Sequence, residues 1–293
     1  MKKQEGDSFL FFIALNLKRR IKIDVRGDRM KWIDSHIHLD QYKNKEQMKL
    51  IDDVKRSTEI DGLIAVSMNY HSCQQTLSLA RQHPFVHPAL GFHPEQPINQ
   101  KECEQIYKLI EANVERLVAI GEIGLPYYLR QEKKDIVLGP YIKVLERFII
   151  LAKRFNLPIV LHAVYEDADI VCDLLEQYEI SRAHFHWFKG SKETMERMIQ
   201  NGYFISITPD VMKKEKIRKI VSFYPLEYMM VETDGPWKFQ ENIMTHPGMI
   251  EGVLKEISLI KNISMEKVAE QIYQNTFRFY GEKKSFVFGF SYR

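Results

Sequence analysis

Two histidines separated by one residue, His36 and His38, follow the β-type run Trp32–Ser35. On a β-strand, side chains two residues apart point to the same face, so both imidazoles would lie on one side of the chain. Two imidazoles on one face can bind one divalent cation, but a His-x-His pattern is common and is weak when it stands alone. The rest of the chain decides whether this pair belongs to a metal site.

Other residues of the kinds that bind metals come at equivalent places, each just after a short β-type run. They are His93, Glu122, His162, His186 and Asp234. A single histidine at the end of a strand is more often a hydrogen-bonded polar residue than a ligand. Side chains that follow the strands of a parallel barrel meet at one mouth, however, so the combination predicts a metal site.

From Lys31 onward, short β-type runs alternate with amphipathic helical patterns, which favours parallel strands joined by helical crossovers. The expected strands are Trp32–Ser35, Gly62–Met68, Val86–Leu90, Leu117–Ile120, Pro158–Leu161, Ala183–Phe185, Tyr203–Ile207 and Tyr228–Val231. Eight such strands predict an α/β fold, a single-domain TIM-like (β/α)8 barrel. An open doubly wound sheet is the alternative, but the Gly-rich turn after its first strand is replaced here by His36-Ile37-His38.

The apolar residues between these strands recur at three- and four-residue spacing, which predicts helices. The expected helices are Lys45–Thr58, Ser72–Arg81, Lys101–Glu115, Pro140–Phe155, Asp167–Tyr178 and Lys192–Gln200. Two more, Pro247–Ile260 and Ser264–Tyr280, are expected after the eighth strand. We expect the last of them to pack on the outside of the barrel.

Hydrophobic residues make up 45% of the chain and charged residues 28%, as in a globular protein with a sizeable core. The net charge of +3 comes from residues 1–29, so the remainder is near neutral and a broadly basic nucleic-acid surface is not indicated. No apolar run has the length needed to cross a bilayer. The three cysteines are far apart and read as reduced thiols, which predicts a cytoplasmic protein.

We expect residues 1–29 to be an extension outside the fold and residues 30–293 to form the barrel. The apolar run Ser8–Leu17 loosely resembles a signal peptide, but Glu5 and Asp7 precede it and no small-residue cleavage site follows. A second interpretation is that translation begins at Met30.

Seven segments of the chain resemble TatD-family metal-dependent hydrolases, which are amidohydrolase-like barrels. In chain order the segments are Asp34–Leu39, Gly91–Pro94, Ile120–Leu125, Leu157–His162, His186–Ser191, Glu232–Pro236 and Asn275–Thr276. Together they span about residues 31–281, and their combination is specific. The resemblance implies a divalent-metal-dependent hydrolase, most nearly a deoxyribonuclease that removes nucleotides from the ends of single-stranded DNA with a metal-activated water.

The resemblance also implies two divalent metal ions and assigns their ligands. One ion would be held by His36, His38 and Asp234, the other by His162 and His186, with Glu122 bridging the two. Imidazole and carboxylate suit Zn, Mn or Mg, so these residues do not select the metal. Two such cations can stabilise the attacking and the leaving oxygen of a phosphoryl transfer. Asp234 and Glu122 would be the catalytic carboxylates, with Asp234 as general base.

The expected substrate contacts depart from the family pattern. His93 is placed to meet a substrate phosphate. The family commonly has an arginine where Val164 stands, so one phosphate contact is missing, and Lys189 could supply replacement charge. The family usually has an aspartate where Pro126 stands, which alters the loop after the fourth strand. DNA is the expected partner, and neither a membrane nor an obligatory protein partner is indicated.

Several other residues allow two interpretations. His184 would share a face with His186 and could support it or replace it as a ligand. The basic run Lys213–Lys219 could contact nucleic acid or be a solvated helix face. The rings near the ligands could stack on bases or pack around the mouth; they are Tyr127, Tyr128, Trp187 and Trp237. The remaining histidines are expected in loops or on the surface; they are His71, His83, His87 and His246.

Two further functions stay open at this point. The same metals could hydrolyse a small amide, lactone or phosphoester, which the near-neutral charge and Val164 favour. Alternatively, the chain could be a catalytically weak partner-binding protein in which the metals are structural.

Overall fold

The computed structural model describes residues 30–240 and 243–281, so the predicted extension, residues 1–29, lies outside the described residues. In the described part, eight parallel strands pair in the order of the sequence. They are β1 (Trp32–Ile37), β2 (Ile60–Ala65), β3 (Val86–Leu90), β4 (Ala119–Gly124), β5 (Ile159–His162), β6 (Ala183–Phe185), β7 (Phe204–Ile207) and β8 (Met229–Val231). The predicted (β/α)8 barrel is confirmed.

The ring closes where the ends of β1 and β8 meet. There the backbone N–H of Asp234 donates to the carbonyl of His36 (3.0 Å), and the N–H of His38 donates to the carbonyl of Gly235 (2.8 Å). These bonds bring the residues that follow β8 against the end of β1.

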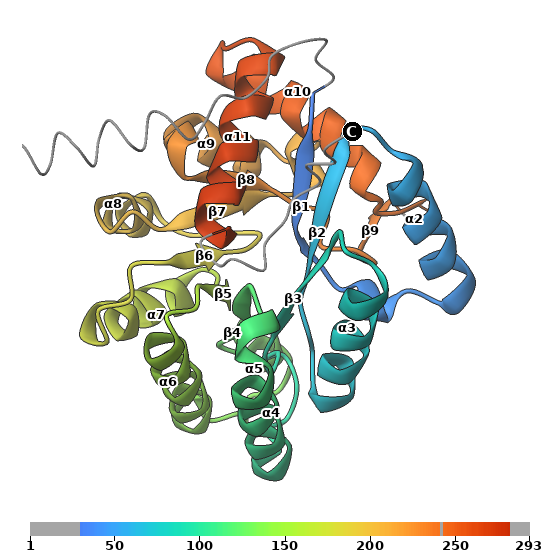
Figure 1. Cartoon of the computed structure of the whole chain (residues 1–293). Helices are drawn as coiled ribbons and strands as arrows, with labels where there is room; N and C mark the ends of the chain where they lie inside the picture. Colours follow the sequence, from blue (N-terminus) through green and yellow to red (C-terminus); the bar gives the residue numbers. More distant parts are fainter. Residues whose placement is uncertain (1–29, 241–242, 282–293) are drawn as a thin grey trace, which may run out of the picture.

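Helices connect the strands and surround the barrel (Figure 1). They are α2 (Asn44–Arg56), α3 (Tyr70–Gln82), α4 (Gln100–Asn113), α5 (Tyr127–Glu132), α6 (Leu138–Phe155), α7 (Glu166–Gln177), α8 (Lys192–Gln200), α9 (Glu215–Phe223), α10 (Ile250–Lys261) and α11 (Met265–Tyr280). Asn69, Asn99 and Ser191 begin α3, α4 and α8, and each side chain accepts a hydrogen bond from a backbone N–H in the first turn.

The predicted helices agree with the observed ones to within a few residues at each end, because their apolar faces follow the helical period. The sequence did not predict α5, which is six residues long and too short to show that period. It also missed the small hairpin of β9 (Lys238–Gln240) and β10 (Ile243–Met244) after β8. Both elements lie in loops that border the mouth of the barrel.

The inside of the barrel is filled by an apolar cluster that includes Ile33, Ile64, Ala89, Val160 and Met230. Residues from strands on all sides of the ring meet in this cluster, and so do Phe279 and Tyr280 from the end of α11. The rest of α11 packs against α10, β8 and β1, with Val268, Ala269 and Ile272 in the cluster between helices and strands. The last helix therefore lies on the outside, as predicted, but its end reaches the interior. In Figure 1, α11 (red) lies beside β1 and β8.

The histidine predictions are corrected at one position. His87 was expected in a loop or on the surface, but it lies on β3 and is buried. It pairs with Ile64 of β2 in the strand register, so its side chain shares the interior face with that residue. His71 is exposed, and His83 and His246 are half-buried.

Among the described residues, no helix combines the length and the apolar character that a membrane span requires. The three cysteines lie in α3, α4 and α7, where they are buried and free.

Candidate active site

The carboxyl ends of the strands bring all six predicted metal ligands together. His36, Glu122 and His162 belong to β1, β4 and β5 themselves, because each of these strands ends further along the chain than the predicted run. His38, His186 and Asp234 follow β1, β6 and β8. All six side chains are buried although every one of them is polar or charged. Such a cluster requires either partners or bound cations.

Glu122 lies at the centre of the cluster, and its two carboxylate oxygens face different histidines. Glu122 Oε2 is 3.2 Å from His36 Nε2 and 3.1 Å from His38 Nε2. Asp234 Oδ1 lies 3.5 Å from each of the same two nitrogens. Four donor atoms thus face one point on this side of Glu122.

The other oxygen of Glu122 faces the opposite half of the mouth. Glu122 Oε1 is 2.9 Å from His162 Nδ1, 2.7 Å from His186 Nε2 and 3.3 Å from His93 Nε2. His93 therefore lies among the metal-type donors. This is closer to the cluster than a contact with the substrate alone would require. Glu122 is placed to bridge two groups of donors.

The donor atoms fit cations better than they fit one another. In the part of the chain that the structure describes, His36 Nε2 and Glu122 Oε2 are buried atoms without a hydrogen-bond partner, although they are close together. Ligands about 2.1 Å from one ion lie roughly 3.0–3.5 Å from each other, as these atoms do. Three groups of histidine and carboxylate could each hold an ion: His36, His38 and Glu122; His93, Glu122 and His162; and His36, His186 and Glu232.

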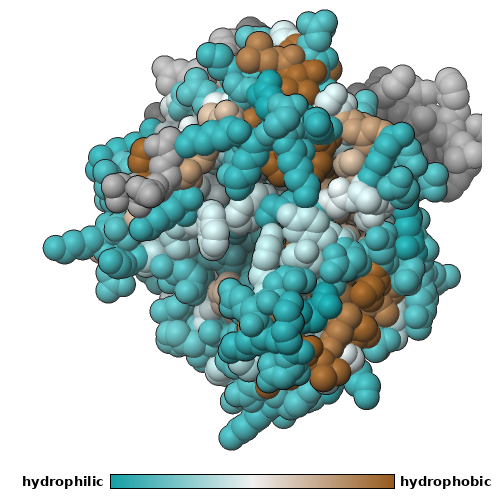
Figure 2. Space-filling view, turned by 180° about the vertical axis from the view of Figure 1, so that it is seen from behind, coloured by the Kyte–Doolittle hydropathy of each residue, from teal (hydrophilic) through white to brown (hydrophobic). Residues whose placement is uncertain are grey.

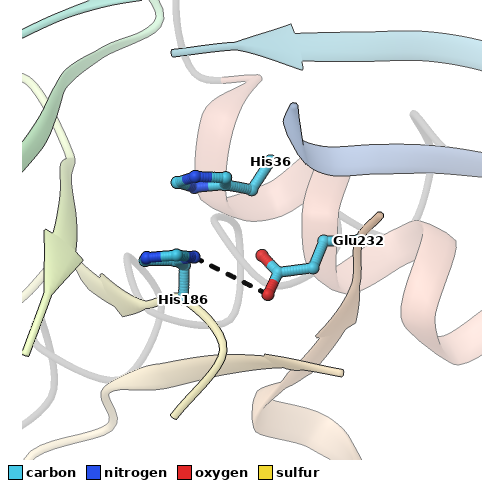
Figure 3. A group of neighbouring side chains, drawn as sticks. All are labelled: His36, His186 and Glu232. Carbon is cyan, nitrogen blue, oxygen red and sulfur yellow. Dashed lines mark ion pairs between the residues drawn. The ribbon is translucent and has the colours of Figure 1, made fainter. Parts of the chain in front are cut away.

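Figure 3 shows the third group, which contains a residue that the sequence analysis did not single out. The rings of His36 and His186 stack with their centres 3.9 Å apart and their planes 7° from parallel, and the Glu232 carboxylate points at His186 from β8. Glu232 Oε1 lies 3.8 Å from His186 Nδ1. A carboxylate on this side favours a proton on Nδ1, which leaves Nε2 free to face Glu122.

Glu232 is itself held by a buried column of hydrogen bonds. Its carboxylate accepts bonds from the backbone N–H of Trp187 (2.8 Å) and from Ser206 Oγ (2.5 Å). Below Ser206, His184 Nε2 lies 2.7 Å from Ser206 Oγ, and His184 Nδ1 lies 2.7 Å from Tyr280 Oη. With Ser206 donating to Glu232, the tautomer of His184 that completes the column donates through Nε2 and accepts from Tyr280 Oη through Nδ1; that hydroxyl also lies 3.5 Å from the carbonyl of Ser35.

This column answers the question that the sequence left open about His184. His184 belongs to none of the three groups of metal-type donors. It therefore supports the site from below, through its contact with Ser206, and does not replace His186. The support passes through Ser206 and Glu232.

A second buried carboxylate fixes the junction between β1 and β8. Asp34 accepts hydrogen bonds from the backbone N–H groups of His36 (3.3 Å) and Thr233 (3.0 Å), and also from the Thr233 hydroxyl. Asp234 follows directly, with a φ of 52° in the left-handed region that non-glycine residues seldom adopt. Asp34 therefore helps hold a strained residue at the site.

Glu95 supports the opposite side of the cluster. Its carboxylate accepts the backbone N–H groups of Tyr128 (2.9 Å) and Leu129 (2.6 Å), and Oε1 lies 3.1 Å from His162 Nε2. The ring of His162 is thus held between Glu95 and Glu122. The backbone at Gly124 lies so close to His162 that a Cβ there would meet its carbonyl at 1.9 Å, so this position requires glycine.

The electrostatics of the cluster favour added positive charge. Burial works to raise the pKa of Glu122, but His186, His93 and His36 bring it well below its usual range. Burial works to lower the pKa of His162, yet its hydrogen bonds to Glu122 and Glu95 raise it to about 9. Burial raises the pKa of Asp234. The histidines thus keep Glu122 ionised, whereas burial makes the charge of Asp234 costly unless positive charge lies beside it.

The buried supporting groups are shifted towards their neutral forms. Burial, followed by the charge of Asp234, raises the pKa of Glu232 well above its usual range. Burial raises the pKa of Asp34 to about 7. Burial also lowers the pKa of His184 and of His36 well below the usual range.

Lys189 lies on the rim and not in the cluster. Its Nζ donates to Tyr128 Oη (2.9 Å) and lies 3.9 Å from the centre of the Trp187 ring. Burial and the neighbouring Lys214 lower its pKa to about 8. Val164, which stands where the family commonly has arginine, is buried two residues after the end of β5, and Pro126 precedes α5.

Two of the residues that sequence reasoning missed, Asp34 and Glu232, lie inside motifs that it had found, and Glu95 comes directly after one. Asp34 precedes the two histidines, Glu95 follows His93 by two positions, and Glu232 precedes Asp234 by two. The signal that could have identified them is an acidic residue within two positions of a metal-type residue.

Known proteins resemble the chain in both fold and sequence. The crystal structure of YJJV, a TatD homolog of Escherichia coli, has a TM-score of 0.73 at 23% identity, and the match covers 86% of this chain and 98% of that one. A protein of Haemophilus influenzae named an uncharacterized metal-dependent hydrolase is 36% identical over 252 residues, 84% of this chain and 98% of its own. The human deoxyribonuclease TATDN3 is 28% identical over 258 residues, 85% of this chain and 94% of its own.

The barrel, the buried histidine and carboxylate cluster and these relatives define the protein as a metal-dependent hydrolase. The family model described as TatD related DNase matches residues 33–281, and the chain belongs to this family.

Proposed function

We propose that this protein hydrolyses phosphodiester bonds of DNA, as an exonuclease on single strands, with two divalent metal ions. The observation that carries the proposal is the division of the donors by Glu122, whose two oxygens face two separate sets of histidines. Two ions held by these two sets of residues would suit an in-line displacement at phosphorus. The deoxyribonuclease name of the human relative supports DNA as the substrate.

The proposed ligands divide as the two oxygens do. His36, His38 and Asp234 would hold one ion with Glu122 Oε2, and His162 and His186 the other with Glu122 Oε1. When bound, the ions supply Lewis acidity, which makes water a better nucleophile and neutralises developing negative charge. Zn, Mn and Mg all remain compatible with these donors.

The protein's own groups would position the substrate and move the proton. Asp234, with a buried carboxylate at the edge of the cluster, would accept the proton from the attacking water. His93 and Lys189 would orient the phosphate from opposite sides of the mouth. Glu232 and Glu95 would keep His186 and His162 in place while the reaction proceeds.

The direct test is release of mononucleotides from end-labelled single-stranded DNA with Mg, Mn or Zn, comparing the wild type with Glu122→Ala. We expect metal-dependent release by the wild type and none by the variant, which should also lose bound metal by elemental analysis. Glu104→Ala, on the outer surface, is the matched control. If the metal-loaded wild type released no nucleotide at high enzyme concentration, the nuclease proposal would be wrong.

A second candidate is hydrolysis of a small amide, lactone or phosphoester by the same cluster. Buried Val164 favours it, because no arginine reaches the mouth from the end of β5. Turnover of such substrates by a protein that leaves DNA intact would establish this alternative.

A further inference from the structure

One side of the mouth carries lysines and aromatic rings beside the metal-type cluster. We call the group formed by Tyr128, Trp187, Lys189 and Trp237 the aromatic strip. It begins at the cluster, because the ring centres of Tyr128 and His162 are 6.1 Å apart. It continues from Tyr128 Oη to Lys189 Nζ (2.9 Å), and from that nitrogen to the Trp187 ring (3.9 Å).

The outer end of the strip is open to solvent. The ring centres of Trp187 and Trp237 lie 5.5 Å apart with an interplanar angle of 67°, and Trp237 is 61% exposed. A large aromatic side chain that exposed has an unused face, and it lies three residues after Asp234. The strip thus leads from the cluster to a free ring surface.

Further lysines flank the strip. Lys214 Nζ lies 5.8 Å from the Trp187 ring centre, and Lys213 Nζ lies 4.1 Å from the ring centre of Phe239. Figure 2, the face turned away from α11, shows side chains of near-neutral hydropathy (white) gathered across the middle and surrounded by hydrophilic ones (teal). Lys213 and Lys214 thus each lie near an aromatic ring, and Lys214 Nζ also pairs with Asp210 Oδ2 (2.7 Å).

The opposite side of the mouth lacks this composition. The loops after β2 and β3, residues 66–69 and 91–99, contain no lysine or arginine, and the turn at 38–43 contains one, Lys43. The carboxylates of Asp40 and Glu95 lie there instead. The loops after β6, β7 and β8 carry Lys189, Lys213, Lys214 and Lys238, together with the carboxylates of Asp210, Glu232 and Asp234. Lysines are thus concentrated on one side of the cluster, although Lys214 pairs with Asp210.

We propose that the aromatic strip binds the part of a single-stranded nucleic acid that follows the reacting end, with bases against Trp187 and Trp237 and a phosphate on Lys189. This inference rests on the proposed function and gives it a direction, because the chain leaves the cluster on one side only. Base stacking on exposed aromatic rings combined with lysine contacts to phosphates is how proteins hold single strands. In a duplex the faces of the bases are covered, so the strip selects single strands.

Binding can be measured without hydrolysis, by fluorescence anisotropy of a labelled thymidylate octamer in EDTA. We expect Trp237→Ala to weaken binding about tenfold, since stacking of one base contributes this much. An abasic octamer with the same backbone should bind the wild type and Trp237→Ala equally. Leu259→Ala, which changes a residue of similar exposure (63%) on α10, should bind like the wild type.

Lys189→Met tests the phosphate contact separately. It should weaken the thymidylate and the abasic octamers alike and reduce the salt dependence of binding by about 0.7 in the log–log slope. Lys255→Met, at an exposed position on α10, is its control.

The proposal that the aromatic strip binds single strands is wrong if the wild type binds neither octamer at low salt, if it binds both equally, or if Trp237→Ala binds the thymidylate octamer like the wild type. These results are independent of catalysis. Base-dependent binding without any hydrolysis would support the strip and contradict the nuclease. Hydrolysis with binding that ignores Trp237 would support the nuclease and contradict the strip.

Discussion

The two ends of the barrel interior differ in chemistry. At the carboxyl ends of the strands, buried imidazoles and carboxylates face one another, and several of their atoms lack hydrogen-bond partners among the described residues. Deeper in the interior, towards what we call the closed end, Ile33, Ile64 and Met230 belong to one apolar cluster with Phe279 of α11. The apolar end stabilises the fold, whereas the polar end costs stability unless cations bind there.

The column of Glu232, Ser206, His184 and Tyr280 joins the two ends. It starts beside His186 and finishes on α11, in the midst of the apolar cluster. The comparison therefore predicts that changes at the mouth affect metal and activity, that changes at the closed end affect stability, and that changes in the column affect both.

Asp234→Asn should produce the largest effect, at the mouth. Loss of the carboxylate that we propose as ligand and general base should lower hydrolysis by about 10³-fold, while the midpoint of thermal unfolding without metal stays within a few degrees. Steady-state rates and thermal scans in EDTA would test this. Asp173→Asn, on the exposed face of α7, should leave both unchanged. A metal-free protein that unfolds far earlier would show that Asp234 is structural.

Ile64→Ala should produce the opposite result at the closed end. Removal of buried methyl groups costs about 2–5 kcal/mol of the free energy of unfolding, because Ile64 is fully buried among interior residues. Urea titration would measure it. The number of metal ions bound by the folded protein should equal that of the wild type. Loss of metal in the folded variant would mean that the two ends are not separable.

His87 makes the closed end sensitive to pH. Burial lowers its pKa to about 4, although Asp61 opposes the shift. The unfolded chain, with an ordinary pKa near 6.5, binds the proton first, so the stability from neutral His87 is complete above about pH 6.5 and is lost as the pH falls towards 4. Between pH 7 and pH 5 the loss should be about 2 kcal/mol.

The measurement for His87 is urea unfolding at both pH values for the wild type and His87→Leu. Between pH 7 and pH 5 the variant should lose about 2 kcal/mol less of its free energy of unfolding than the wild type loses. Equal losses would show that His87 is not buried in its neutral form.

Tyr280→Phe should produce the smallest effect, and it acts on both ends. Without the Tyr280 hydroxyl, His184 Nδ1 loses its donor, so the support of Glu232 weakens and metal affinity should fall about tenfold. Titration with Co²⁺ followed by visible absorption would report both affinity and ligand geometry. Tyr224→Phe is the matched control, since its buried hydroxyl donates to the carbonyl of Tyr203 instead. An unchanged Co²⁺ spectrum and affinity in Tyr280→Phe would exclude a positioning role.

Much of the fold was predictable because it depends on local periodicity. The eight strands and the long helices appear in the sequence as runs with periods of two and 3.6 residues, and the metal-type residues come after those runs. The resemblance to the family assigned the six ligand positions, and the structure brings them together. The sequence did not show that the end of α11 reaches the interior of the barrel, because an apolar helix face shows that something is covered, but not what it covers.

The sequence by itself determined the order of the strands, the chemical types at their ends and hence the class of hydrolase. Only the tertiary structure decided which oxygen of Glu122 faces which histidine, and that Glu232, Asp34 and Glu95 lie against the residues of the cluster. The physical reason is distance along the chain: His184 and Tyr280 are 96 residues apart, and Asp34 and Thr233 are 199 apart. Such contacts exist only once the barrel has closed.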